Sequence, residues 1–149
     1  MRNIDEIIVN VKVLFCSLVT TCVPGLSWDP AGITVAGVTG VKGSNLSLFS
    51  YTNDVGVDMY YNIYIADTDN QRIQRFAPNS SVGQTVAGVS GNPGSGSNQL
   101  NYPRAIYITG DVLFISDLSN YRVQRYSYNA TSGTTVAGGE SLHLVLNDF

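Results

Sequence analysis

Charged and metal-binding side chains are scarce in this 149-residue chain. Charged residues make up only 13% of the sequence, and the formal net charge is −3. A nucleic-acid-binding domain usually carries a basic excess, so nucleic acid is not an expected partner. One His and two Cys are too few for the usual four-ligand zinc site. We therefore predict no metal and no other cofactor.

Long apolar runs are also lacking. The longest, residues 7–23, is interrupted by Asn10 and Lys12 and is too short and polar for a convincing membrane span. Its uninterrupted part has the length of a signal-peptide core, which predicts a secreted protein, with a cytoplasmic location as the alternative. Residues 9–13 alternate with period two, which fits a strand instead. Residues 1–24 are thus either a leader or an irregular segment.

The two cysteines lie upstream of everything else that is patterned. Cys16 and Cys22 could form a disulfide across a short loop, or Cys16 could be lost with a cleaved leader. Two cysteines do not define a disulfide framework, so the compartment stays open on this evidence.

The chain does contain a repeat. Residues 62–76 read NIYIADTDNQRIQRF, and residues 112–126 read VLFISDLSNYRVQRY. The tetrad TVAG occurs three times, at 34–37, 85–88 and 135–138. A period near fifty residues is typical of repeat architectures, in which each unit buries its apolar surface against a neighbour.

Each repeat has the pattern of four short strands. Fifteen Gly, nine Tyr and many β-branched residues favour strands joined by turns. In the second copy we expect strands at 105–108, 112–116, 122–126 and 134–137. The run 112–116 is apolar throughout and predicts a strand buried on both faces. Residues 91–97, rich in Gly and Ser, predict a flexible loop between the units.

Four antiparallel strands per fifty residues describe the blades of a β-propeller. The predicted fold is all-β, an incomplete propeller with two full blades, about 38–88 and 89–138, plus partial flanking strands. Residues 139–149 are a tail or the start of a truncated next blade. Closed propellers have about four to eight blades. The chain is therefore expected to be a fragment of a longer propeller, or to self-associate through its open blade faces.

The repeated motif resembles that of a known family. Its Asp, Asn and Arg positions are Asp67, Asn70 and Arg72 in the first copy, and Asp117, Asn120 and Arg122 in the second. Strand-Ala-Asp-x-x-Asn-x-Arg-Ile-x-x-Phe resembles the NHL repeat, and the resemblance covers about residues 28–138. The TVAG tetrads and glycine-rich linkers are similar to those of extracellular NHL proteins with longer periods.

The resemblance implies a non-catalytic binding or scaffold module for a protein or small-molecule ligand. One alternative is the partial propeller of an NHL-related lyase or hydrolase whose active site lies on other blades. A second is an RNA-binding NHL propeller, which the acidic net charge disfavours.

The six motif residues are predicted to be structural. Asp and Asn favour turns by bonding nearby backbone groups, and an Arg stands close enough to each Asp to neutralise it. Recurrence once per unit also indicates framework rather than catalysis, so we assign no catalytic and no metal-binding residue. Arg75 and Arg125 complete the only basic grouping, which we expect to pair with acids rather than phosphates. His143 lies outside both repeats, with no partner identified.

Three N-glycosylation acceptors occur, at Asn45, Asn79 and Asn129. Asn79 and Asn129 occupy equivalent positions of the two repeats. They are compatible with secretion, because glycans require exposed loops of this kind.

Overall fold

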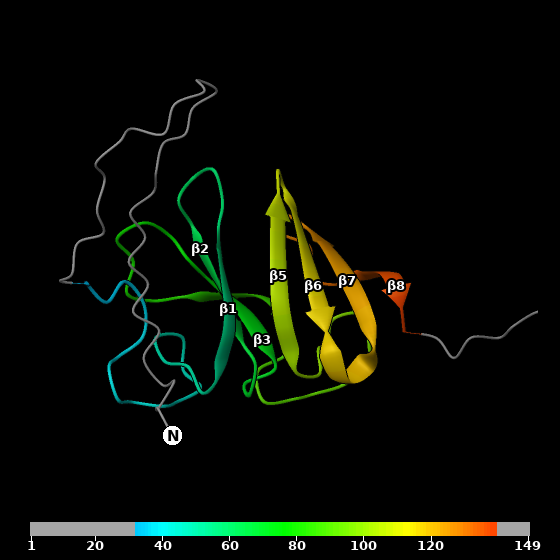
Figure 1. The fold of residues 1–149 in the computed structure, drawn as a ribbon, viewed down its shortest axis with the longest axis horizontal. Coiled ribbons are helices and arrows are strands. Elements are labelled where there is room, and N and C mark those ends of the chain that lie inside the picture. The colour runs from blue at the N-terminus through cyan, green and yellow to red at the C-terminus, as the bar shows by residue number, and fades with distance from the viewer. Residues whose placement is uncertain (1–31, 140–149) are drawn as a thin grey trace, which may run out of the picture.

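The computed structural model describes residues 32–139, which form two four-stranded antiparallel sheets (Figure 1). The predicted leader with Cys16 and Cys22, the residue His143 and nearly all of the predicted tail lie outside the described residues. Between residues 32 and 139, no helix is long and apolar enough to cross a membrane.

Each sheet contains its four strands in chain order. The first consists of β1 (Thr52–Val57), β2 (Ile63–Asp67), β3 (Arg72–Phe76) and β4 (Gln84–Gly88). The second consists of β5 (Pro103–Thr109), β6 (Val112–Asp117), β7 (Arg122–Ser127) and β8 (Thr134–Gly138). A single 3₁₀ turn, η1 (Leu118–Asn120), joins β6 to β7. The prediction of an all-β chain with four antiparallel strands per repeat is confirmed.

The final position of the TVAG tetrad requires glycine for steric reasons in both sheets. Gly88 and Gly138 have φ angles of 81° and 70°, a region that side chains other than glycine rarely adopt. A Cβ at these positions would collide with the carbonyl oxygens of Gln71 and Tyr121, respectively. The last strand of each sheet can therefore close onto its neighbour only with glycine at this point.

The first TVAG tetrad, residues 34–37, forms no strand in the part of the chain that the structure describes. The residues that follow it make only isolated bridges, Val38 with Val41 and Lys42 with Phe49. An edge strand needs a hydrogen-bonded neighbour, and no described strand lies alongside this tetrad. The predicted leading flanking strand is therefore absent from the described residues.

The two sheets pack face to face, with β1 and β5 side by side at the centre (Figure 1). Their shared core contains Tyr64, Ala66, Ile73 and Ala87 from the first sheet, Leu113, Ile115 and Tyr126 from the second, and Leu100 from the connection. Gly56 on β1 admits the side chain of Ile108, because a Cβ would lie 2.9 Å from its Cδ1. The backbone N–H of Ile106 also donates to Oδ2 of Asp54 across the interface, at 2.8 Å.

Burial of β6 differs from the prediction. Leu113, Ile115 and Asp117 are buried, whereas the intervening Phe114 and Ser116 are half-exposed. The equivalent strand of the first sheet, β2, is buried at four successive residues. The prediction that β6 is buried on both faces is wrong, because no described sheet covers the outer face of the second sheet.

Candidate binding site

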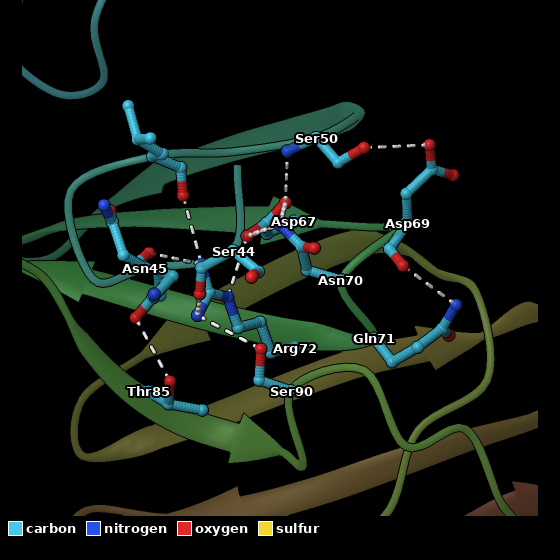
Figure 2. A network of polar contacts seen from close by, with 12 residues as sticks. Ser44, Asn45, Ser50, Asp67, Asp69, Asn70, Gln71, Arg72, Thr85 and Ser90 are labelled. Carbon is cyan, nitrogen blue, oxygen red and sulfur yellow. Dashed lines mark hydrogen bonds and ion pairs between the residues drawn. The ribbon is translucent and has the colours of Figure 1, made fainter. Parts of the chain in front are cut away.

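An ion pair lies at the centre of the repeated motif in the first sheet. Nε of Arg72, at the start of β3, donates to Oδ2 of Asp67, at the end of β2, at 2.8 Å. Asn70, in the turn between them, donates from Nδ2 to both carboxylate oxygens, at 3.0 and 2.9 Å. The N–H of Ser50 donates to Oδ1 at 3.0 Å. The carboxylate is therefore neutralised and accepts hydrogen bonds on both oxygens (Figure 2).

The remaining donors of Arg72 hold the loop that precedes the first sheet. Nη1 donates to the carbonyl of Ser44 at 2.7 Å, and Nη2 donates to those of Asn45 and Leu48 at 2.8 and 3.0 Å. Nδ2 of Asn70 adds a bond to the carbonyl of Gly43 at 2.8 Å. A guanidinium has five N–H donors. Most of them are occupied by the chain itself, so this arginine fixes a loop.

The second copy of the motif makes the same contacts. Nε of Arg122 donates to Oδ2 of Asp117 at 2.7 Å. Its Nη1 donates to the carbonyl of Ser95 at 2.7 Å, and its Nη2 to those of Gly96 and Gln99 at 2.9 and 3.0 Å. The ion pairs that the sequence spacing predicted are thus present in both sheets, each inside its own sheet.

The connection between the sheets is therefore held in place. Residues 91–97 were predicted to be a flexible spacer, but the carbonyls of Gly94, Ser95 and Gly96 accept bonds from Asn120 and Arg122. That prediction is wrong, because the backbone carbonyls of this glycine-rich segment accept hydrogen bonds from the guanidinium of Arg122. Among residues 32–139, no three His, Cys, Asp or Glu side chains come together as a metal site would require.

The three glycosylation acceptors lie on the surface. Asn45, Asn79 and Asn129 are all exposed. Asn79 and Asn129 occupy equivalent turns with positive φ angles of 62° and 57°. The side chain of Asn45 accepts a bond from the N–H of Ser47 at 2.9 Å. Their positions satisfy the exposure that glycan attachment requires.

A cleft of about 930 Å³ opens between the two sheets. Its walls come from β2, β3, β4 and the loop between β1 and β2 in the first sheet, and from β5, β6, β7 and the loops that follow β5 and β7 in the second. Polar and aromatic side chains converge there: Asp58, Tyr60, Asn62, Tyr64, Arg75, Gln84, Asp111 and Tyr128. Sequence reasoning did not identify this site, because its walls come from both repeats.

Arg75 is the one cationic side chain among the described residues that line this cleft. Its Nη2 donates to Oε1 of Gln84 at 2.7 Å, and its Cζ lies 5.3 Å from the ring centre of Tyr128. Burial lowers the pKa of Arg75, but hydrogen bonds with Tyr128 and Tyr64 outweigh it and raise the pKa overall. Burial and the nearby charge of Asp58 raise the pKa of Tyr64. At neutral pH the cleft therefore presents a charged guanidinium beside the neutral phenol of Tyr64.

Asp58 shapes the rim of the cleft. Its Oδ1 accepts from the N–H groups of Tyr60 and Asn62, each at 2.9 Å. Its Oδ2 accepts from Nδ2 of Asn62 at 2.7 Å and from the hydroxyl of Tyr64 at 3.2 Å. One carboxylate thus fixes the loop between β1 and β2 and orients two cleft side chains.

Several of the polar and aromatic cleft residues have no counterpart of the same type in the other repeat. Phe114 occupies the second-sheet position equivalent to Tyr64, and Val112 the position equivalent to Asn62. Pro78 occupies the first-sheet position equivalent to Tyr128. Differences between the two copies are the one signal in the sequence that could have identified this site.

No protein-family model matches the chain, and no curated protein matches it.

Proposed function

We propose that this chain is part of an NHL-type β-propeller and serves as a non-catalytic binding or scaffold module. The two sheets would be adjacent blades of a larger ring. The observation that carries the proposal is the face-to-face packing of two equivalent sheets, in which the second sheet repeats the face that the first one buries.

The equivalent faces differ in how far a neighbouring sheet covers them. On the first sheet, Ala66 and Ile73 are fully buried against the second sheet. Their counterparts on the second sheet, Ser116 and Val123, are half-exposed, and Tyr107 on the same face is 64% exposed. An open apolar face of this kind favours a further sheet as its occupant, from a longer chain or from another copy.

A scaffold role agrees with the use of the repeated polar residues. Asp67 and Asp117 are neutralised by arginines that also hold backbone carbonyls, which leaves them unsuited to acid–base work. The polar groups that differ between the copies gather in the cleft instead. Variable side chains on a constant frame are typical of binding modules, for a protein or a small-molecule ligand.

The mass of the chain in solution tests this proposal. We expect the wild-type protein to self-associate with increasing concentration in sedimentation experiments, because no sheet among residues 32–139 covers its outer face. Val123→Asp places a charge on that face and should lower the average mass. Val82→Asp, on an exposed loop, is the matched control and should leave it unchanged. A compact wild-type monomer at every concentration, with cooperative unfolding, would contradict the proposal.

We further propose that the protein is secreted. The apolar stretch near the N-terminus and the three exposed acceptor asparagines support this location. N-terminal sequencing of material from a secreting host tests it. Removal of a leader from the mature protein is expected, and retention of Met1 would contradict it.

A further inference from the structure

We propose that the cleft between the two sheets binds a neutral sugar. This inference rests on the proposed binding role and adds the chemical class of the ligand. It is drawn from the charges, the aromatic side chains and the hydrogen-bonding groups around Arg75.

The charges in the cleft exclude strongly ionic ligands. Arg75, Asp58 and Asp111 all line the cleft. An anionic ligand would meet two carboxylates, and a cationic ligand would meet the guanidinium. A neutral ligand avoids both repulsions. The chain as a whole is acidic, with a net charge of −3, which further disfavours anions.

The hydrogen-bonding groups exclude a purely apolar ligand. The guanidinium of Arg75 and the amides of Gln84 and Asn62 all line the cleft. An apolar occupant would leave desolvated donors and acceptors without partners. A sugar hydroxyl both donates and accepts, so it can bond to a guanidinium, an amide and a carboxylate in turn.

Tyrosine rings supply the remaining feature of a sugar site. Tyr60 and Tyr128 are 63% and 56% exposed, and both line the cleft. An exposed tyrosine offers an apolar ring and a polar hydroxyl, which match the C–H face and the hydroxyl edge of a pyranose. A volume of about 930 Å³ lies in the upper range of ligand pockets and suits several sugar units.

The arginine recurs in both repeats, but its surroundings in the cleft do not. Arg125 is the second-sheet counterpart of Arg75, yet its Nη1 bonds to Oγ of the nearby Ser127 and it does not line the cleft. Phe114, paired with Arg125 in the register, lacks the hydroxyl that Tyr64 provides beside Arg75. The arginine is thus common to both copies, whereas the side chains around it differ between them.

Calorimetric titration of the full chain with cellopentaose, xylopentaose, mannopentaose and chitopentaose tests the inference. We expect at least one of these neutral pentasaccharides to bind. Arg75→Gln and Tyr128→Ala should each weaken that binding at least about tenfold, which corresponds to about 1.4 kcal/mol. Arg125→Gln is the matched control and should bind as the wild type does. A circular dichroism spectrum checks that each variant is folded. Gln84→Ala, at an exposed position, replaces Arg75→Gln if the latter is unfolded.

Three outcomes would overturn the inference: no binding of any neutral pentasaccharide, binding that these variants leave unchanged, or binding confined to a sulfated heparin oligosaccharide. None of them affects the propeller proposal, which the sedimentation of Val123→Asp tests separately. Concentration-dependent self-association without sugar binding would therefore reject the sugar and retain the scaffold.

Discussion

Arg72 and Asp67 form an ion pair of 2.8 Å in which the two side chains are only 1% and 0% exposed. The pair connects β2 to β3, and through its remaining donors the arginine also fixes the loop before β1. A contact between two adjacent strands thus determines the course of a segment more than twenty residues upstream.

Arg72→Leu is expected to lower the free energy of unfolding by about 3–5 kcal/mol, because it leaves a buried carboxylate without its cation. Arg122→Leu should cost less, since part of its loop network is exposed. Arg104→Ala, at an exposed position of β5, is the control and should change stability by less than about 0.5 kcal/mol. Urea unfolding measures all three. Similar losses for Arg72→Leu and Arg104→Ala would show that the buried pair does not fix the loop.

Gln74→Met is expected to leave stability unchanged or to raise it. Gln74 is fully buried, and its Nε2 has no hydrogen-bond partner among the described residues. Methionine has a similar volume and leaves no unpaired amide. Gln124, the counterpart in β7, has the same unpaired nitrogen and should respond to the same substitution. Thermal unfolding checks both, and a loss above about 2 kcal/mol would contradict the expectation.

Asp58→Ala is expected to destabilise the loop between β1 and β2, by about 1–2 kcal/mol, because one carboxylate accepts four bonds there. Hydrogen exchange should become faster at the amides of Tyr60 and Asn62. Asp111→Ala changes the corresponding hairpin of the second sheet, where no such set of bonds is present, and is the matched control. If the amides of Tyr60 and Asn62 exchanged equally fast in the two variants, Asp58 would not be what holds this loop.

Stability should decline as pH rises above about 10, in part through Tyr126. Burial raises the pKa of its phenol in the folded state. The unfolded state then ionises first and binds fewer protons, so the free energy of unfolding falls as pH rises through the folded-state pKa. Tyr126→Phe should make the decline shallower. It also removes the hydroxyl's bond to the carbonyl of Ser97, so its stability at pH 8 should be lower.

Urea unfolding at a series of pH values between 8 and 11.5 measures this effect. Tyr121→Phe, at a side chain that is 86% exposed, is the control and should keep the decline of the wild type. A decline of equal steepness in Tyr126→Phe and the wild type would contradict the assignment.

The strands of both sheets could be predicted because period-two alternation and turn residues are local signals. The segment Val112–Asp117 was located well, but its burial was not, since burial depends on which sheet lies opposite. Residues 91–97 were misread for a similar reason. Glycine and serine in this segment suggest a flexible backbone. In the structure, however, their carbonyls accept hydrogen bonds from Arg122, more than twenty residues away in sequence.

The cleft around Arg75 could not be predicted from either repeat alone. Arg75 and Gln84 come from the first sheet, and Tyr128 comes from a loop of the second. Only the packing of the sheets brings them together. Gln74 was also missed, because a glutamine in an alternating strand gives no sign that it is buried.

The carbonyl contacts of the two arginines have a consequence for how such units could be exchanged between proteins. Ser90 and Gly91 still bond to residues of the first sheet, whereas Gly94 already bonds to the second. The boundary between the two units therefore lies at residues 92–93, within the connecting loop rather than at the first strand of the second sheet. A duplication or a graft cut at that boundary would carry each anchoring arginine together with the loop that it anchors.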